Sequence, residues 1–139
     1  MNFKTESTNS LTIEGIEEPN IINYFTTINR EEFEQTATLF TEEGQMLAPF
    51  EKPIVGREAI ASYLKKEAKG MKLLPNQIIH QSSEDNSFQH QIRGKVKTSL
   101  FSVNVAWYFN LNLEQKITIV KIKLLASPQE LLNLQRKNN

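Results

Sequence analysis

The chain has 139 residues, no cysteine, and 16 basic side chains against 16 acidic ones, so its formal net charge is zero. This length fits one domain with one core, and the zero charge provides no general attraction for nucleic acid or an anionic membrane. The lack of cysteine excludes disulfides, thiol nucleophiles and thiolate metal sites. No apolar run approaches the roughly 20 residues needed to span a bilayer, and the polar start lacks the apolar stretch of a secretory signal. We therefore expect a soluble, cytoplasmic protein.

Helical patterns dominate the first half of the chain. A polar tail is expected over residues 1–12. Pro19 suits the first position of a helix, and the apolar residues after it share one helical face: Ile21, Tyr24, Phe25 and Ile28. A second short helix is predicted near residues 31–40, with Gly44 as its stop. A third is predicted over about 57–69, between Gly56 and Gly70.

Strand patterns dominate the second half, after a short predicted strand at 45–49. From Met71 the apolar period changes to two, most regularly where Val103, Val105, Trp107, Phe109 and Leu111 alternate with polar or smaller residues. Hairpin connections are predicted at 82–87 and 112–116. A capping box at 127–130 begins a short Leu-rich helix, and residues 135–139 form a second tail.

Helices followed by a long, curved antiparallel sheet predict an α+β fold with one domain over residues 13–134. Helices packed on the concave face of such a sheet form a cone with an apolar interior. The interior is the natural place for a ligand pocket.

Candidate acid–base and metal-binding groups are few. Asp85 is the only aspartate and lies in a predicted turn, and no glutamate falls at an inward position of the predicted strands after Met71. His90 shares the parity of Ile92 and could point inward, but no orienting carboxylate accompanies it. His80 and His90 do not have the spacing or the companions of a metal site. We therefore expect neither an enzyme nor a metalloprotein.

Two aromatic side chains combine an apolar body with a hydrogen-bond donor. Trp107 lies on the buried face of the most regular strand, and Tyr24 lies on the inward face of the first helix. An indole N–H or phenol O–H that is buried without a partner costs about 1–3 kcal/mol. If both point into one cavity, a carbonyl oxygen of an apolar ligand could accept from both. Alternatively, each is an ordinary core aromatic that donates to the backbone.

Four segments follow one another along the chain: Tyr24-Phe25, Pro53-Ile54-Val55-Gly56-Arg57-Glu58, Asn104-Val105-Ala106-Trp107 and Leu124-Leu125-Ala126-Ser127-Pro128. On these segments, in this order, the sequence from about Ile13 to Leu134 resembles the C-terminal domain of the orange carotenoid protein of cyanobacteria, and in particular its free-standing homologues. The resemblance implies a nuclear-transport-factor-2-like cone, in agreement with the order of elements above.

The resemblance also implies a ligand and its site. A ketocarotenoid such as canthaxanthin or echinenone would be the cofactor, with its ring carbonyl accepting hydrogen bonds from Tyr24 and Trp107. The tunnel lining implied by the resemblance consists of Ile28, Val55, Met71, Leu73, Thr98, Phe101, Val105, Ile122 and Leu124. The implied roles are carotenoid transport, with transient membrane contact and transfer to helical carotenoid-binding partner domains, and quenching of reactive oxygen. The C-terminal Leu-rich helix would gate the empty pocket.

Leu100 occupies a position where full-length members of the family commonly have a tryptophan that contacts their helical domain. This replacement, together with the missing helical domain, favours a free-standing carrier. Glu67 matches an interdomain salt-bridge position, but its partner is not in this chain. A domain of this size has a radius of gyration of roughly 14 Å, so a carotenoid held at one end would protrude into water. A second copy would cover it, which predicts a homodimer that shares one pigment.

Two different functions remain open at this point. One is a small cone-fold isomerase or dehydratase that acts on an apolar ring substrate, with Tyr24 as oxyanion donor and His90 as base. The second is a dimerisation module with a filled core, for which no cavity would lie beside Trp107.

Overall fold

The computed structural model describes residue 16 and residues 18–79 and 87–125. In this part of the chain the elements are α1 (Pro19–Asn29), α2 (Phe33–Thr38), β1 (Phe40–Leu47), β2 (Ile54–Val55), α3 (Arg57–Glu67), β3 (Lys72–Ile79), β4 (His90–Lys97), β5 (Ser102–Leu111) and β6 (Ile117–Leu125). Helices therefore precede most of the strands, as the sequence predicts.

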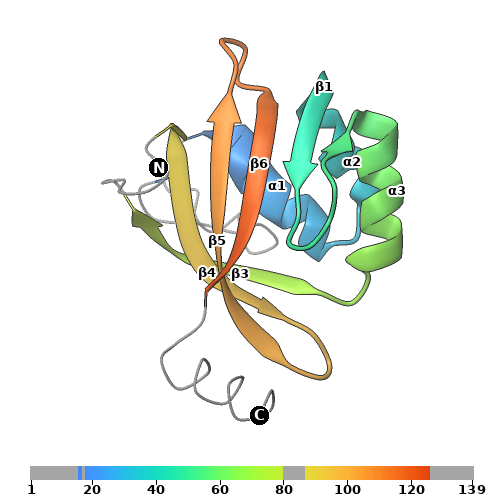
Figure 1. Cartoon of the computed structure of the whole chain (residues 1–139), viewed down its shortest axis with the longest axis vertical. Coiled ribbons are helices and arrows are strands. Elements are labelled where there is room, and N and C mark those ends of the chain that lie inside the picture. The colour runs from blue at the N-terminus through green and yellow to red at the C-terminus, as the bar shows by residue number, and fades with distance from the viewer. Residues whose placement is uncertain (1–15, 17, 80–86, 126–139) are drawn as a thin grey trace, which may run out of the picture.

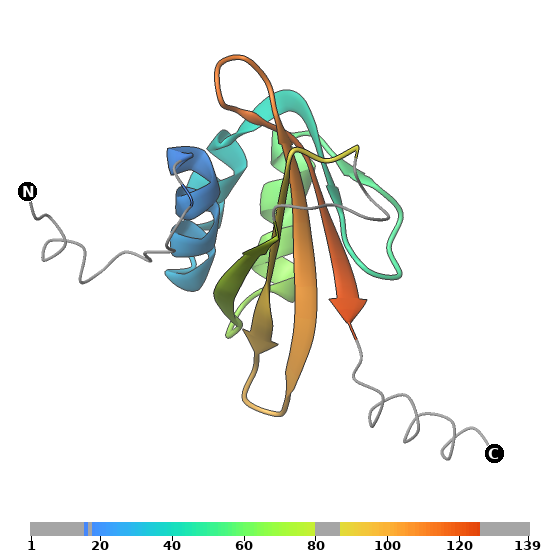
Figure 2. The same ribbon diagram turned by 90° about the vertical axis from the view of Figure 1, so that its left-hand side faces the viewer.

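The strands form one curved sheet in the order β2-β1-β6-β5-β4-β3. Figure 1 shows α1 crossing behind the long strands and α3 beside β1 and β2, and Figure 2 shows the same arrangement from the side. The sheet is not closed into a barrel. The α+β cone is confirmed.

One strand pair differs from the antiparallel sheet that the sequence predicts. β1 runs parallel to β6, with Met46 opposite Val120, whereas the other neighbouring strands are antiparallel. The pairing joins the first and the last strands of the described chain, so no hairpin connection links them. The sheet is consequently mixed, and α3 and four strands lie between these two partners in sequence.

β1 also begins earlier than predicted. Gly44, expected to end a helix, lies inside β1, and the preceding helix already ends at Thr38. A Cβ at Gly44 would lie 3.0 Å from the Cβ of Phe40 and 3.0 Å from the carbonyl oxygen of Ile117. Close packing of β1 on β6, rather than helix termination, accounts for this glycine.

An aromatic cluster joins α1 to the concave face of the sheet. The ring of Phe25 meets Trp107 edge-on at 4.8 Å, and the ring of Tyr24 meets Phe109 edge-on at 5.1 Å. Each of these side chains is buried. Edge-to-face pairs are worth about 0.5–1.5 kcal/mol beyond the area that they bury, so they fix the orientation of both aromatic donors.

The predicted alternation of β5 is confirmed on its concave face, where Val105, Trp107 and Phe109 are buried. The opposite face is less exposed than the pattern suggests. Tyr108 is buried there, with the ring of Phe88 at 5.6 Å and the ammonium group of Lys121 at 5.9 Å. Long neighbouring side chains therefore cover the middle of the convex face.

Three predicted features lie wholly or partly outside the described residues: the polar tails, the 82–87 connection and the Leu-rich helix after residue 127. The 112–116 connection is a turn. The side-chain oxygen of Asn112 accepts hydrogen bonds from the backbone N–H groups of Glu114 and Lys116, both at 2.9 Å.

Candidate functional site

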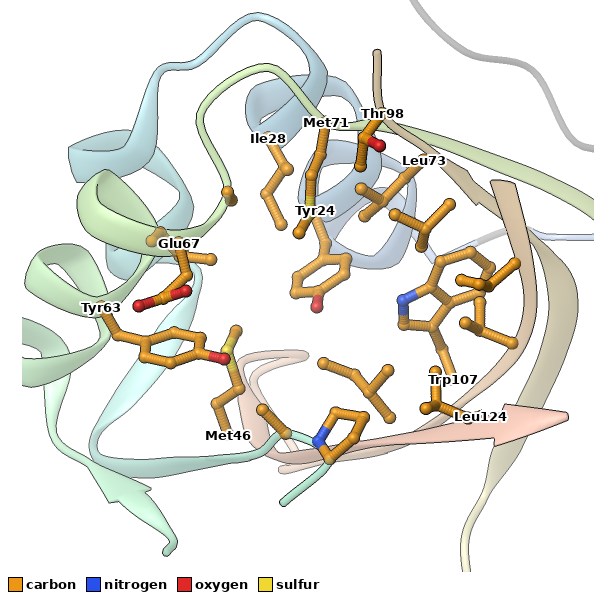
Figure 3. A pocket seen from close by; sticks show the side chains of 18 of the residues that line it. Tyr24, Ile28, Met46, Tyr63, Glu67, Met71, Leu73, Thr98, Trp107 and Leu124 are labelled. Carbon is orange, nitrogen blue, oxygen red and sulfur yellow. The ribbon is translucent and has the colours of Figure 1, made fainter. Parts of the chain in front are cut away.

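A pocket with a cavity volume of about 410 Å³ lies between the helices and the concave face of the sheet. Its wall is almost entirely apolar, and Figure 3 shows the side chains around it. It is lined by Tyr24, Ile28, Met46, Ala48, Pro49, Tyr63, Leu64, Glu67, Ala68, Met71, Leu73, Val96, Thr98, Phe101, Val103, Val105, Trp107, Ile122 and Leu124. This volume falls within the ~300–1,000 Å³ of small-molecule sites.

Tyr24 reaches the pocket from α1. Its side chain is buried, and its ring is wedged edge-on against Phe25 at 5.3 Å and Phe109 at 5.1 Å. The hydroxyl group points into the cavity (Figure 3). Burial, with a smaller contribution from Tyr63, raises the pKa of Tyr24 well above its usual value. The phenol is therefore a neutral hydrogen-bond donor at any physiological pH.

Trp107 reaches the same pocket from β5. In the sheet it lies between Ile92 of β4 and Ile122 of β6, and Phe25 of α1 packs edge-on against its ring. Its indole nitrogen faces the cavity and the hydroxyl of Tyr24 (Figure 3). Among the residues that the structure describes, no hydrogen-bond acceptor pairs with this nitrogen or with the Tyr24 hydroxyl. The two donors therefore converge on an apolar space without a protein acceptor.

The chemistry that would satisfy both donors is narrow. A carbonyl oxygen has two lone pairs and can accept two hydrogen bonds at once. Most of the remaining wall is apolar, and its other polar side chains are those of Tyr63, Thr98 and Glu67. The pocket thus fits an apolar molecule that carries one carbonyl group at its inner end.

All but one of the predicted lining residues border this pocket. The pairs of residues spaced by two in sequence (Met71 with Leu73, Val105 with Trp107, Ile122 with Leu124) all line it, as expected for side chains that share one face. Val55 does not. It is 52% exposed at the end of the short edge strand β2, whereas its neighbour Ile54 packs against the core. That these residues bind a carotenoid stays a prediction.

Sequence reasoning missed the wall that α3 and β1 contribute. The sequence predicts only a helix over about 57–69 and a short strand at 45–49 here, without a place in the pocket for Leu64, Ala68 or Met46. Tyr63 and Glu67 are one helical turn apart and both line the pocket. Tyr63 and Glu67 each precede a residue of the apolar helical face, Leu64 and Ala68, with the same spacing of four residues. This pattern was the signal in the sequence that could have placed them beside the pocket.

Carboxylates and histidines are poorly placed for acid–base chemistry in this pocket. Glu67 is the one carboxylate among the lining residues, and its side chain is exposed. Glu42 and Glu43, expected outside strands, lie in β1 but are also exposed. His90 is not part of the lining; its Nδ1 atom lies 4.0 Å from a carboxylate oxygen of Glu18. Among the described residues, the base that the enzyme hypothesis assigns, His90, therefore does not border the pocket, and no group of three or more potential metal ligands occurs there.

Large apolar side chains are exposed next to the lining residues. Phe101 and Leu124 are themselves part of the lining and are 56% and 45% exposed. Leu100 and Phe50, which adjoin the lining residues Phe101 and Pro49 in sequence, are 86% and 95% exposed. We call these four residues the apolar rim. Such a rim around a pocket is typical of a surface that another molecule covers.

A cavity lies beside Trp107, whereas the hypothesis of a dimerisation module with a filled core predicts none there. In such a module, core side chains would occupy the space that the indole N–H faces. Across the described ranges, no helix combines the length and apolarity needed to cross a membrane.

Comparison with known proteins agrees with this architecture. Residues 21–121 match the model of the nuclear transport factor 2 (NTF2) domain. The chain is 39% identical over 136 residues to the orange carotenoid-binding protein of Synechocystis, and 40% identical over 126 residues to that of Limnospira maxima. These alignments cover 95% and 88% of this chain but only 43% and 40% of the relatives. The chain thus spans less than half the length of these relatives, and it corresponds to their C-terminal domain.

Solved structures give the same result. The orange carotenoid protein of Anabaena binding canthaxanthin matches 89% of this chain with a TM-score of 0.74 and 37% identity, covering 41% of that protein. The epoxide hydrolase/cyclase-like enzyme SalBIII shares only the fold, with a TM-score of 0.63 and 15% identity over 80% of this chain and 90% of that enzyme. The resemblance found in the sequence is confirmed: the chain belongs to the NTF2 family and is a homologue of the orange carotenoid protein's C-terminal domain.

Proposed function

We propose that the protein binds one end of a ketocarotenoid, such as canthaxanthin or echinenone, in the pocket between α1, α3 and the sheet. The observation that carries the proposal is the pair of buried donors, Tyr24 and Trp107, that face an apolar cavity without a protein acceptor among the described residues. A ring ketone would accept from both, and the polyene would run along the apolar wall. The canthaxanthin-binding structure of a relative with 37% identity supports this choice of ligand.

The visible absorption spectrum tests the proposal directly. The full chain is mixed with canthaxanthin and, as a matched control, with β-carotene, which has the polyene but no carbonyl. Hydrogen bonds that polarise the carbonyl should shift the absorption of canthaxanthin strongly to the red, and the complex should survive gel filtration. A canthaxanthin spectrum no different from that in detergent, or equal retention of β-carotene, would refute a site built around the ketone.

The apolar rim supports a shared pigment. A polyene that leaves the pocket past Phe101 and Leu124 would expose hydrocarbon to water, at about 25 cal/mol per Å² of exposed surface. A second copy of the chain would cover both the rim and the free end of the pigment. We therefore propose a homodimer with one carotenoid for two chains. Light scattering with pigment absorbance measures this ratio, and one pigment for each monomer would contradict it.

The biological role that follows is carotenoid carriage. A carrier takes up pigment from membranes and passes it to helical carotenoid-binding domains, and bound ketocarotenoid quenches singlet oxygen. Vesicles loaded with canthaxanthin test uptake, because transfer should colour the protein fraction after the vesicles are sedimented. Pigment that stays entirely with the vesicles would argue against exchange with membranes.

A further inference from the structure

The pocket contains a third aromatic hydrogen-bond donor that the proposed function does not use. Tyr63 lies on α3, half-buried, across the cavity from Trp107, and its hydroxyl points toward the interior of the pocket (Figure 3). Within the described part of the chain this hydroxyl has no hydrogen-bond partner. It is therefore available to a ligand.

The remaining polar groups of the wall are not equivalent to Tyr63. The hydroxyl of Thr98 is already engaged in its own turn, where it accepts from the backbone N–H groups of Leu100 and Phe101 at 3.1 and 3.2 Å. Glu67 is exposed and lies beside the Tyr63 ring (Figure 3). Burial and the nearby carboxylates of Glu51 and Glu67 raise the pKa of Tyr63, so its hydroxyl stays protonated.

A phenol O–H both donates and accepts, which is the complement of an alcohol. Tyr24 and Trp107 both donate to the ligand, so the group between them must be an acceptor, and the ketone fills this role. The polar substituents of a carotenoid are confined to its end rings, since the polyene is hydrocarbon. A polar group within reach of Tyr63, while the ketone remains on Tyr24 and Trp107, must therefore lie on the same ring.

We propose that Tyr63 is a specificity-determining residue that recognises a hydroxyl group on the ring carbon next to the ketone. This inference rests on the proposed function and makes it more specific. The pocket then prefers hydroxylated keto rings over keto rings without the hydroxyl. Tyr63 stands on a different element from Tyr24 and Trp107, so Tyr63→Phe keeps both ketone donors.

The test compares two pigments that differ at this position. Astaxanthin has a hydroxyl beside each ring ketone, whereas canthaxanthin has the ketones alone. The dissociation constants of both are measured with the full chain, with Tyr63→Phe and, as a matched control on the convex face of the sheet, with Tyr108→Phe. One hydrogen bond should favour astaxanthin by about fivefold in the unmodified protein.

Tyr63→Phe should abolish this preference, so that its dissociation constants for astaxanthin and canthaxanthin agree within about twofold. Canthaxanthin binding also serves as the check that the variant is folded. Tyr108→Phe should keep the preference. Equal affinity for both pigments in the unmodified protein, or a preference that persists in Tyr63→Phe, would overturn the role of Tyr63. Failure of the unmodified protein to bind either pigment would instead refute the proposed function itself.

Discussion

Replacing Tyr24 with phenylalanine should have opposite effects on stability and on ligand binding. The ring stays wedged between Phe25 and Phe109, and only the hydroxyl, which is buried without a partner among the described residues, is removed. An unsatisfied buried polar group costs about 1–3 kcal/mol, and the opening of the pocket to solvent places Tyr24 at the low end of that range. We therefore expect Tyr24→Phe to raise the free energy of unfolding of the empty protein by about 1 kcal/mol.

Thermal and urea denaturation measure this effect. For a chain of this length, 1 kcal/mol corresponds to an increase in Tm of about 3 °C. The same variant should bind canthaxanthin more weakly, by about fivefold, because one hydrogen bond to the ketone is lost. Tyr108→Phe is the matched control, since Tyr108 is buried outside the pocket and has interactions of its own. A loss of stability in Tyr24→Phe would show that the hydroxyl is already paired in the empty protein, and would refute the reasoning.

Three further predictions concern the scaffold and the protonation of the site. Gly94→Ala should destabilise the fold by about 3 kcal/mol, because the new Cβ would lie 2.3 Å from the carbonyl oxygen of Leu74. The Cβ of Gly70→Ala would meet open space, so this variant should lose only about 1–2 kcal/mol, because of the positive φ at this position. Urea denaturation compares the two variants, and equal losses of stability would contradict the steric account. Phe25 does not line the pocket, but Phe25→Leu removes the edge contact that orients Trp107 and should therefore reduce the red shift of bound canthaxanthin. An unchanged spectrum would show that the strand alone orients the indole. Because burial raises the folded-state pKa of Tyr24 above its ordinary value of 10.0, its phenol ionises first in the unfolded chain, so the free energy of unfolding does not depend on this group below pH 10 and falls as the pH rises from 10 toward the folded-state pKa. Urea denaturation between about pH 8 and pH 11 should therefore show a steeper decline in stability above pH 10 in the unmodified protein than in Tyr24→Phe. Parallel curves would contradict it.

The sequence predicted the parts of the site that depend on local periodicity. The period of two along β5 places Val105 and Trp107 on one buried face, and the helical period of α1 places Tyr24 and Ile28 inward. These residues lie together because both faces are apolar and pack against each other. The family resemblance added the ligand and its two donors, which periodicity alone could not distinguish from ordinary core aromatics.

The parts that were missed depend on contacts between distant segments. The parallel pairing of β1 with β6 brings Met46 to the pocket, and the position of α3 beside β1 brings Tyr63 there. Neither the parallel strand pairing nor the position of α3 can be predicted from the residues that neighbour Met46 and Tyr63 in sequence. Val55 belongs to a strand of two residues, which is too short to show an alternation, so its outward direction could not be read from the sequence.

The most direct test of the proposed function is the spectrum of canthaxanthin bound to the double variant Tyr24→Phe with Trp107→Phe. Both substitutions keep an aromatic side chain in the apolar wall, so the pigment can still enter while both donors are gone. We expect the variant to bind canthaxanthin with most of the red shift lost. A bound spectrum identical to that of the unmodified protein would contradict the claim that these two groups hold the ketone.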